Sequence, residues 1–191
     1  MTKNKSILYK AFGQYSDLSG AVMEQFEEIM VERLFARGEL LVREGDLCDR
    51  LFFIEQGVVR SYHYREVKDV TISFAQSGDF TTSMSGFVTG KPSYEYIEAL
   101  EDTTVLELGR GQLLKLFEVA PQCGDVYRQM LEAYYVRLEE HFIFSKFKTA
   151  KERYFELIEG NPQIIRSATI GQIASYLGIS IETLSRIRAG R

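Results

Sequence analysis

TIGQIASYLGISIETLSRIR, residues 169–188, predicts two short helices joined by a tight turn. Thr169 and Gln172 have the spacing of a capping box, in which each side chain satisfies a free backbone N–H of the other residue. Gly178 follows the last apolar position of the first helix, where the chain needs a residue that tolerates positive φ. Ser180 then supplies a second N-cap, and the apolar positions after it direct the second helix onto the same small core.

The second helix presents polar and basic side chains outward, as a helix that enters the major groove of DNA does. We therefore expect a DNA-contacting set that consists of Thr169, Ser180, Glu182, Thr183, Ser185, Arg186 and Arg188. Ordinary helical hairpins with solvated charges share this layout, so the pattern alone leaves both interpretations open.

Charge is distributed unevenly along the chain. The net charge is −4, yet residues 145–191 hold eight Lys and Arg against four Asp and Glu. Residues 1–144 hold fifteen Lys and Arg against twenty-three Asp and Glu. A basic C-terminal segment on an acidic body is typical of a small DNA-binding module attached to a second domain.

Composition bounds the class of protein. A hydrophobic content of 45% over 191 residues is enough for a substantial core in one larger and one smaller domain. The chain has no run of eighteen apolar residues and no apolar signal segment, so we expect a cytoplasmic protein without membrane contact.

Two cysteines, Cys48 and Cys123, favour a reducing compartment. The two histidines, His63 and His141, complete no ligand cluster, so we expect no metal and no cofactor.

The residues before 110 divide into two regions by their hydrophobic pattern. Residues 1–36 show helical spacing after a polar start at Asp17 and Ser19. The apolar positions of that pattern are Leu18, Val22, Phe26, Ile29, Met30 and Leu34. Residues 37–109 alternate short β-rich runs with glycine turns, which predicts an antiparallel sandwich or barrel.

A long helix is predicted at about 122–147, with Pro121 in its first turn. One side of it carries residues in alternating steps of four and three, as in a helix that pairs with a partner helix. This dimer-helix set is Tyr127, Leu131, Tyr134, Leu138 and His141, followed by Ser145. Packing of the helix on its own domain is the alternative, but pairs of helix-turn-helix units on two half-sites favour a homodimer.

A second capping box marks a domain boundary. Thr149 and Glu152 are predicted to start a new helix that ends before Gly160–Asn161–Pro162. We therefore expect a domain over residues 1–147, which ends with the dimerisation helix, and a DNA-binding domain over residues 148–191.

With these elements in place, the whole chain resembles the cyclic AMP receptor protein/Fnr (Crp/Fnr) family of bacterial transcription factors. The resemblance is carried by the Gly45–Asp46 turn, Gly57, the Gly78–Asp79–Phe80 turn and the segment SIETLSRIR, residues 180–188. It implies an α+β protein with a cyclic-nucleotide-binding-like antiparallel jelly-roll β-barrel as sensor, a long dimerisation helix and a C-terminal helix-turn-helix domain. The wing of that domain is expected to be reduced.

The resemblance also implies the function of a sequence-specific transcriptional regulator that is not an enzyme. Such a protein binds a two-fold-symmetric double-stranded DNA site as a homodimer, with RNA polymerase as a further partner. Glu182 and Arg186 match the base-reading pair of the family: a Glu accepts from cytosine N4, and an Arg forks onto guanine. Ile181 stands where the family often has an Arg, so the preferred site is expected to differ. Lys146, Lys148, Lys151 and Arg166 are candidates for contacts to the DNA backbone.

The expected sensor departs from members that bind cyclic nucleotides. Ser83, Ser93 and Tyr94 occupy the positions of the family's ribose-binding Glu and phosphate-binding Arg–Ser pair, so we expect no binding of cyclic AMP. The candidates for lining a pocket for another, unknown small-molecule effector are Ser83, Met84, Ser93, Tyr94 and Tyr134. A filled pocket is the alternative. The N-terminus also lacks the cysteine cluster of iron–sulfur members.

Two rival functions stay open at this point. The barrel could bind a ligand while the C-terminal helices bind a protein rather than DNA. A cupin-like enzyme would need a His and Glu metal cluster, and His63 is the only histidine in the predicted strands. No Ser-His-Asp, Cys-His or phosphate-loop arrangement is present in the sequence.

Overall fold

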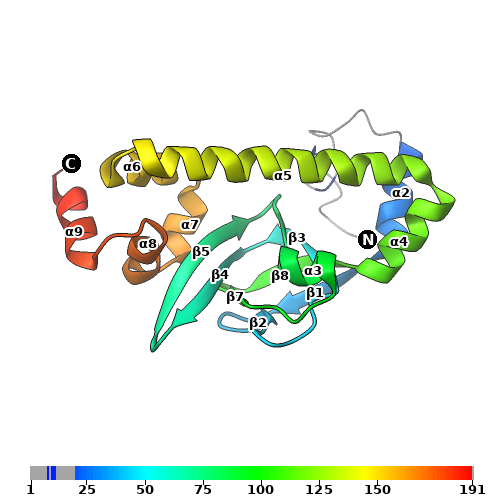
Figure 1. Cartoon of the computed structure of the whole chain (residues 1–191), viewed down its shortest axis with the longest axis horizontal. Coiled ribbons are helices and arrows are strands. Elements are labelled where there is room, and N and C mark those ends of the chain that lie inside the picture. The colour runs from blue at the N-terminus through cyan, green and yellow to red at the C-terminus, as the bar shows by residue number, and fades with distance from the viewer. Residues whose placement is uncertain (1–7, 9, 12–19, 191) are drawn as a thin grey trace.

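The structure is a computed structural model that describes residues 8, 10–11 and 20–190. Two antiparallel sheets lie beside one long helix, and short helices gather at the far end of that helix (Figure 1). The strands are β1 (Met30–Phe35), β2 (Leu40–Val42), β3 (Arg50–Gln56), β4 (Val58–Arg65), β5 (Lys68–Gln76), β6 (Phe80–Thr81), β7 (Tyr96–Ala99) and β8 (Thr103–Gly109). The helices are α2 (Gly20–Ile29), α3 (Met84–Thr89), α4 (Arg110–Val119), α5 (Pro121–Phe147), α6 (Ala150–Gly160), α7 (Pro162–Ser167), α8 (Ile170–Tyr176) and α9 (Ile181–Ala189).

Each sheet has four strands, in the orders β1-β8-β3-β6 and β2-β7-β4-β5. Alternate residues of β4 and β7 face a shared interior: Val59 pairs with Ala99 and Ser61 with Ile97. The apolar core of this interior consists of Val42, Cys48, Phe52, Ile54, Val59, Ala75, Ile97 and Val105. The antiparallel sheets predicted for residues 37–109 are therefore confirmed, and the helices lie outside them.

The helix predicted within residues 1–36 ends earlier than expected, so the prediction is wrong for residues 30–35. Helix α2 ends at Ile29, and Met30–Phe35 forms β1, which pairs along its whole length with β8. Leu34 is 73% exposed instead of buried. Pairing with a sheet edge overrides the local spacing here, because strand formation depends on neighbours that periodicity does not report. Leu18 and the polar start at Asp17 and Ser19 lie outside the described residues.

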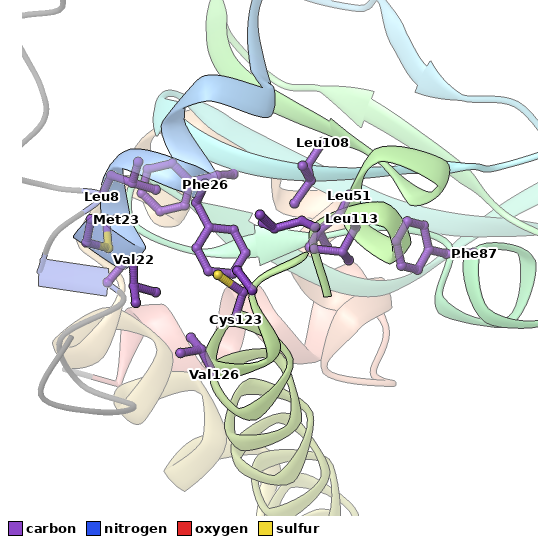
Figure 2. Close-up of a cluster of buried hydrophobic side chains, with 14 residues drawn as sticks. Leu8, Val22, Met23, Phe26, Leu51, Phe87, Leu108, Leu113, Cys123 and Val126 are labelled. Carbon is purple, nitrogen blue, oxygen red and sulfur yellow. The ribbon is translucent and has the colours of Figure 1, made fainter. Parts of the chain in front are cut away.

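A second apolar cluster attaches the flanking helices to the first sheet. Figure 2 shows Phe26 of α2, Leu113 of α4 and Cys123 of α5 close to Leu51 and Leu108 of the strands. Cys123 is fully buried and its thiol is free, so both cysteines are packing residues, as Cys48 is in the other core.

Helix α5 matches the predicted long helix and begins with Pro121 in its first turn. Its N-terminal part is held by this cluster through Val126, and Tyr127 contacts Phe117 at 5.4 Å between ring centroids. Arg137 reaches Asp79 in the turn before β6, at 3.8 Å. From Tyr134 onward the helix carries many exposed apolar side chains.

Both predicted capping boxes are confirmed. Thr149 and Glu152 cap α6 reciprocally, and Thr169 and Gln172 do the same for α8. Gly178 turns the chain between α8 and α9 with a φ of +65°, and the Ser180 hydroxyl accepts from the backbone N–H of α9. Residues 148–190 form only helices and their connections.

The C-terminal helices pack on the second sheet of the same chain. Their core consists of Tyr154, Leu157, Ile164, Ile173, Ala174, Leu177 and Leu184, together with Val58 and Leu100. Ser167 Oγ donates to Glu101 Oε2 at 2.7 Å, and the Thr71 backbone N–H donates to Ser175 Oγ at 3.0 Å. One apolar core therefore joins the sheet to the helices that follow residue 148. None of the described helices is both long enough and apolar enough to span a bilayer.

Candidate DNA interface and sensor pocket

Helix α9 is fixed on one side and free on the other. Leu184 is fully buried and Ile187 packs against the same core, which sets the rotation of the helix. The predicted DNA-contacting side chains of this segment are exposed or partly exposed: Ser180, Glu182, Thr183, Ser185, Arg186 and Arg188. Thr169 is exposed at the start of α8. The structure thus brings the predicted DNA-contacting residues to one end of the molecule, on a helix whose orientation is determined by its core.

The charge order of α9 follows the helix dipole. Glu182 lies in the first turn, and Arg186 and Arg188 lie in the last. Hydrogen bonds from its own backbone N–H and from Ser180 lower the pKa of Glu182. The carboxylate is therefore ionised at neutral pH and available as an acceptor one helical turn from the Arg186 guanidinium.

The four candidates for contacts to the DNA backbone differ in whether their charge is already paired within the chain. Lys148 forms an ion pair with Glu156 at 2.6 Å and lies over the Phe144 ring, so its charge is already engaged within the chain. Lys146, Lys151 and Arg166 are exposed. These three are the better placed of the four predicted backbone contacts.

The predicted sensor pocket surrounds a carboxyl group that the sequence analysis did not single out. Ser83 and Ser93 are buried, and the Ser93 hydroxyl donates to Ser83 Oγ at 2.9 Å. Glu95 is buried beside them. Burial raises its pKa, while hydrogen bonds from Ser83 and Ser61 and the nearby charge of His63 oppose that rise in part. A carboxyl group thus lies beside Ser83 and Ser93, which stand at the positions of the family's ribose-binding Glu and phosphate-binding Arg.

Aromatic side chains lie near these residues. Tyr94 stacks on His63 with ring centroids 5.1 Å apart, and His63 Nδ1 is hydrogen-bonded to the Tyr94 carbonyl. Tyr134 of α5 lies near Glu95 and Tyr94, and it is 46% exposed. Met84 begins α3 next to Ser83 and is partly buried. Of the five predicted lining residues, Ser83, Ser93, Tyr94 and Tyr134 therefore lie near Glu95, and Met84 adjoins Ser83.

The predicted dimer-helix residues divide into two groups. Tyr127 packs within its own chain, and Leu131 is partly buried. Tyr134, Leu138 and His141 are exposed, and they continue into exposed Phe142 and Phe147. Tyr134, Leu138 and Phe142 therefore form an exposed apolar row on the C-terminal half of α5, whereas the His141 ring also contacts Tyr176 of α8.

Known proteins of similar sequence are bacterial regulators. Residues 32–119 match the model of the cyclic nucleotide-binding domain, a stretch that holds nearly all of both sheets and the residues around Glu95. The chain is 25% identical over 185 residues to Electron transport regulator A of Shewanella oneidensis, covering 89% of this chain and 72% of that protein. The chain is thus similar to regulators of the Crp/Fnr family.

Solved structures agree with the Crp/Fnr assignment at the level of the fold. FixK2 from Bradyrhizobium japonicum superposes with a TM-score of 0.68 at 23% identity, covering 85% of this chain and 84% of that one. A Crp/Fnr-family regulator from Eubacterium rectale superposes with a TM-score of 0.69 at 16% identity, covering 95% and 87%. Curated Crp/Fnr relatives of this chain carry the names of transcription regulators.

Glu95 is the residue of this site that could not be identified from motif positions alone. The sequence does contain one indication of its burial: a period of two from Ser93 to Ala99 places Ser93, Glu95, Ile97 and Ala99 on one face. Ile97 and Ala99 are fully buried, and Glu95 is buried on the same side of the strand. The family's motif positions align with Ser93 and Tyr94, and Glu95 is the residue after them.

Replacing Glu95 with glutamine is expected to raise the free energy of unfolding at neutral pH, by about 1 kcal/mol. The raised folded-state pKa means that the protonated carboxyl fits the pocket better than the carboxylate. Stability tied to Glu95 is therefore fully present below the unfolded pKa and is lost as pH rises through the folded pKa. Urea unfolding of both proteins across pH 4–8 measures this difference.

The gain from Glu95→Gln should shrink toward pH 4, where the wild-type carboxyl is itself protonated. Glu118→Gln removes a carboxylate from an exposed position on α4 and serves as the control. An equal effect of both variants on the free energy of unfolding would contradict the assignment of Glu95 as a buried carboxyl group with a raised pKa. A stabilisation by Glu95→Gln that does not change with pH would contradict it as well.

Proposed function

We propose that this Crp/Fnr chain is a sequence-specific DNA-binding regulator that acts as a homodimer on a two-fold-symmetric site. The observation that carries the proposal is the α8–turn–α9 unit, in which buried Leu184 fixes α9 while Glu182 and Arg186 are exposed one turn apart. This is the arrangement that lets a second helix enter the major groove as its partner helix crosses the backbone. The DNA-binding domain is assigned to residues 148–191 and the sensor domain with its dimerisation helix to residues 1–147.

Glu182 and Arg186 are assigned to base reading. The carboxylate of Glu182 accepts from cytosine N4, and the guanidinium of Arg186 donates to guanine O6 and N7. The remaining polar residues of the set contact phosphates or set the register of the helix. Lys146, Lys151 and Arg166 supply electrostatic contact to the DNA backbone.

The apolar face of α5 supports the homodimer. Two copies that pair along Tyr134, Leu138 and His141 would bury side chains that one copy leaves in water. A two-fold axis along α5 would present two α9 helices to successive major grooves, about one helical turn of DNA apart. RNA polymerase is the expected partner of the DNA-bound dimer.

The sensor pocket is assigned to a ligand other than cyclic AMP or to no ligand. An anionic phosphate would meet the Glu95 carboxyl and two serines where it needs a guanidinium. Residues 78–100 contain one cation, Lys91, which is exposed. The sensor is therefore closed to a cyclic phosphate by charge as well as by the packing of Ser83 against Ser93.

Selection from a pool of random DNA duplexes tests the DNA-binding function. We expect the purified chain to enrich a palindrome whose half-sites lie about 10–10.5 base pairs apart. Arg186→Ala should lower affinity by about five- to 150-fold for each half-site, because one bidentate base contact is lost in each, and the loss on the whole palindrome combines both half-sites. Binding at two salt concentrations separates this loss from the electrostatic contribution of the backbone contacts.

Arg65→Ala is the matched control, since Arg65 is an exposed arginine at the far tip of the β4–β5 hairpin. It should leave the enriched sequence and its affinity unchanged. Enrichment of the same palindrome by Arg186→Ala would remove Arg186 from base reading. Failure of the wild-type chain to bind any duplex at the lower salt would overturn the proposed function and favour a protein-binding C-terminus.

A further inference from the structure

A cavity lies away from the residues around Glu95, where the end of the dimerisation helix meets the C-terminal helices. Its volume is about 180 Å³, and α5, α6 and α8, which converge at that end of Figure 1, all contribute to its wall. The residues that matter for its chemistry are His141, Phe144, Arg153, Asn161, Tyr176 and Leu177. Drug-sized ligands occupy pockets of roughly 300–1,000 Å³, so this cavity suits a smaller molecule.

One wall of the cavity carries an arginine with unused hydrogen-bonding capacity. Arg153 Nε is buried, and no group of the described residues accepts a hydrogen bond from it. A buried donor of a charged group without an acceptor is costly, so an acceptor that reaches it gains more than one at the surface. Glu156 is the carboxylate that lines the cavity. It forms an ion pair with Lys148 at 2.6 Å, so its negative charge is already paired with a cation other than Arg153.

The remaining walls combine flat rings with apolar side chains. Tyr176 lies between Phe74 and His141, with ring centroids at 5.2 and 5.7 Å. Burial raises the pKa of Tyr176, opposed by the Arg153 charge, so its hydroxyl is a neutral donor or acceptor. Phe144 and Leu177 add apolar surface to the wall of the cavity. One cationic end and an aromatic or aliphatic body describe the complement of a small organic acid.

We propose that this cavity binds a small organic monoanion, a carboxylate with an aromatic or apolar body, whose carboxylate is held by Arg153. The ligand would touch the dimerisation helix, the first helix after the domain boundary and the end of α8 at once. Its occupancy therefore favours one arrangement of the C-terminal helices relative to α5. The proposal does not depend on DNA binding, and its test does not use DNA.

The two histidines give the test its own internal control. His141 lines the proposed cavity, whereas His63 lies at the sensor pocket against Tyr94. We would titrate the full-length chain with benzoate at constant pH and ionic strength and follow the imidazole proton NMR signals. Variants His141→Gln and His63→Gln assign the two sets of signals. Binding in the cavity should shift the His141 signals saturably and leave those of His63 in place.

Arginine variants then test the anchor. Arg153→Gln should weaken benzoate binding by at least about tenfold, since a charge-assisted hydrogen bond is lost. Arg153→Lys keeps the charge and the alkyl stem, so it carries the test if the glutamine variant fails to fold. It should also weaken binding, because a lysine lacks the fork. Arg65→Gln, which removes an arginine from the hairpin tip, should bind as the wild type does.

Inorganic phosphate in place of benzoate shows whether the apolar body contributes. Weaker binding of phosphate supports the assigned ligand class, whereas equal binding overturns it. Unchanged His141 signals up to saturating benzoate, shifts confined to His63, or undiminished binding by both Arg153 variants would each overturn the proposal.

Discussion

Leu138→Glu is expected to convert the protein into a monomer and to lower its affinity for the palindromic site by at least about hundredfold. Leu138 is 52% exposed in the single chain, on the face of α5 that also carries Tyr134 and Phe142. In the proposed dimer the two copies of Leu138 lie near the two-fold axis. Two carboxylates brought there would lose water and repel each other. Loss of the second half-site contact then removes the gain from bivalent binding.

Sedimentation equilibrium measures the mass of the wild-type and variant chains, and titration of a fluorescent duplex measures affinity. Leu114→Glu is the matched control, because Leu114 is 45% exposed on α4 and lies outside the proposed interface. It should remain a dimer with unchanged DNA affinity. A dimeric Leu138→Glu, or a wild-type chain that is monomeric at micromolar concentration, would rule out pairing through this face of α5.

The elements that could be predicted from sequence are those with local chemical signatures. Each capping box fixes a helix start because two side chains satisfy two backbone N–H groups within four residues, as Thr149 and Glu152 do. Gly178 marks its turn because the backbone there has a positive φ, which few other residues adopt. Such features need no distant partner, so they appear in the sequence itself.

What could not be predicted depends on distant partners. Residues Met30–Phe35 have helical spacing, and only the presence of β8 alongside them makes them a strand. The short helix α7 was not expected either, and it is held through Gln163 and Ser167, which bond Glu101 of the β7–β8 turn. Neither contact has a local signature that periodicity or turn chemistry would reveal.

The sensor pocket shows the same division. The serines at 83 and 93 could be named because they stand at family motif positions, but their mutual hydrogen bond and the burial of Glu95 are tertiary facts. The cavity beside Arg153 is harder still to predict from sequence, because its lining residues are up to 36 positions apart. Sites assembled across elements require the structure.

Leu184→Ala is expected to lower the free energy of unfolding by about 3–5 kcal/mol, the cost of deleting a buried leucine from a core that cannot collapse around the gap. Leu184 is fully buried in a cluster that unites α6, α7 and α8 with Val58 of β4 and Leu100 after β7. The loss should therefore weaken the attachment of the C-terminal helices to the sheet as well as α9 itself. Urea unfolding followed by circular dichroism measures the energy, and amide hydrogen exchange measures its location.

Ile181→Ala is the matched control on the same helix, because Ile181 is 51% exposed and should cost no more than about 0.5 kcal/mol. Faster exchange is expected in α8, α9 and the start of β4, whereas α2 and α4 belong to a different cluster and should keep their protection. Equal effects of the two alanine variants would show that Leu184 is not an anchor. Faster exchange confined to α9 would show that the shared core does not couple the C-terminal helices to the sheet. Coupling through this core is what fixes the reading helix relative to the dimer axis, so DNA affinity should fall with Leu184→Ala even though Arg186 is intact.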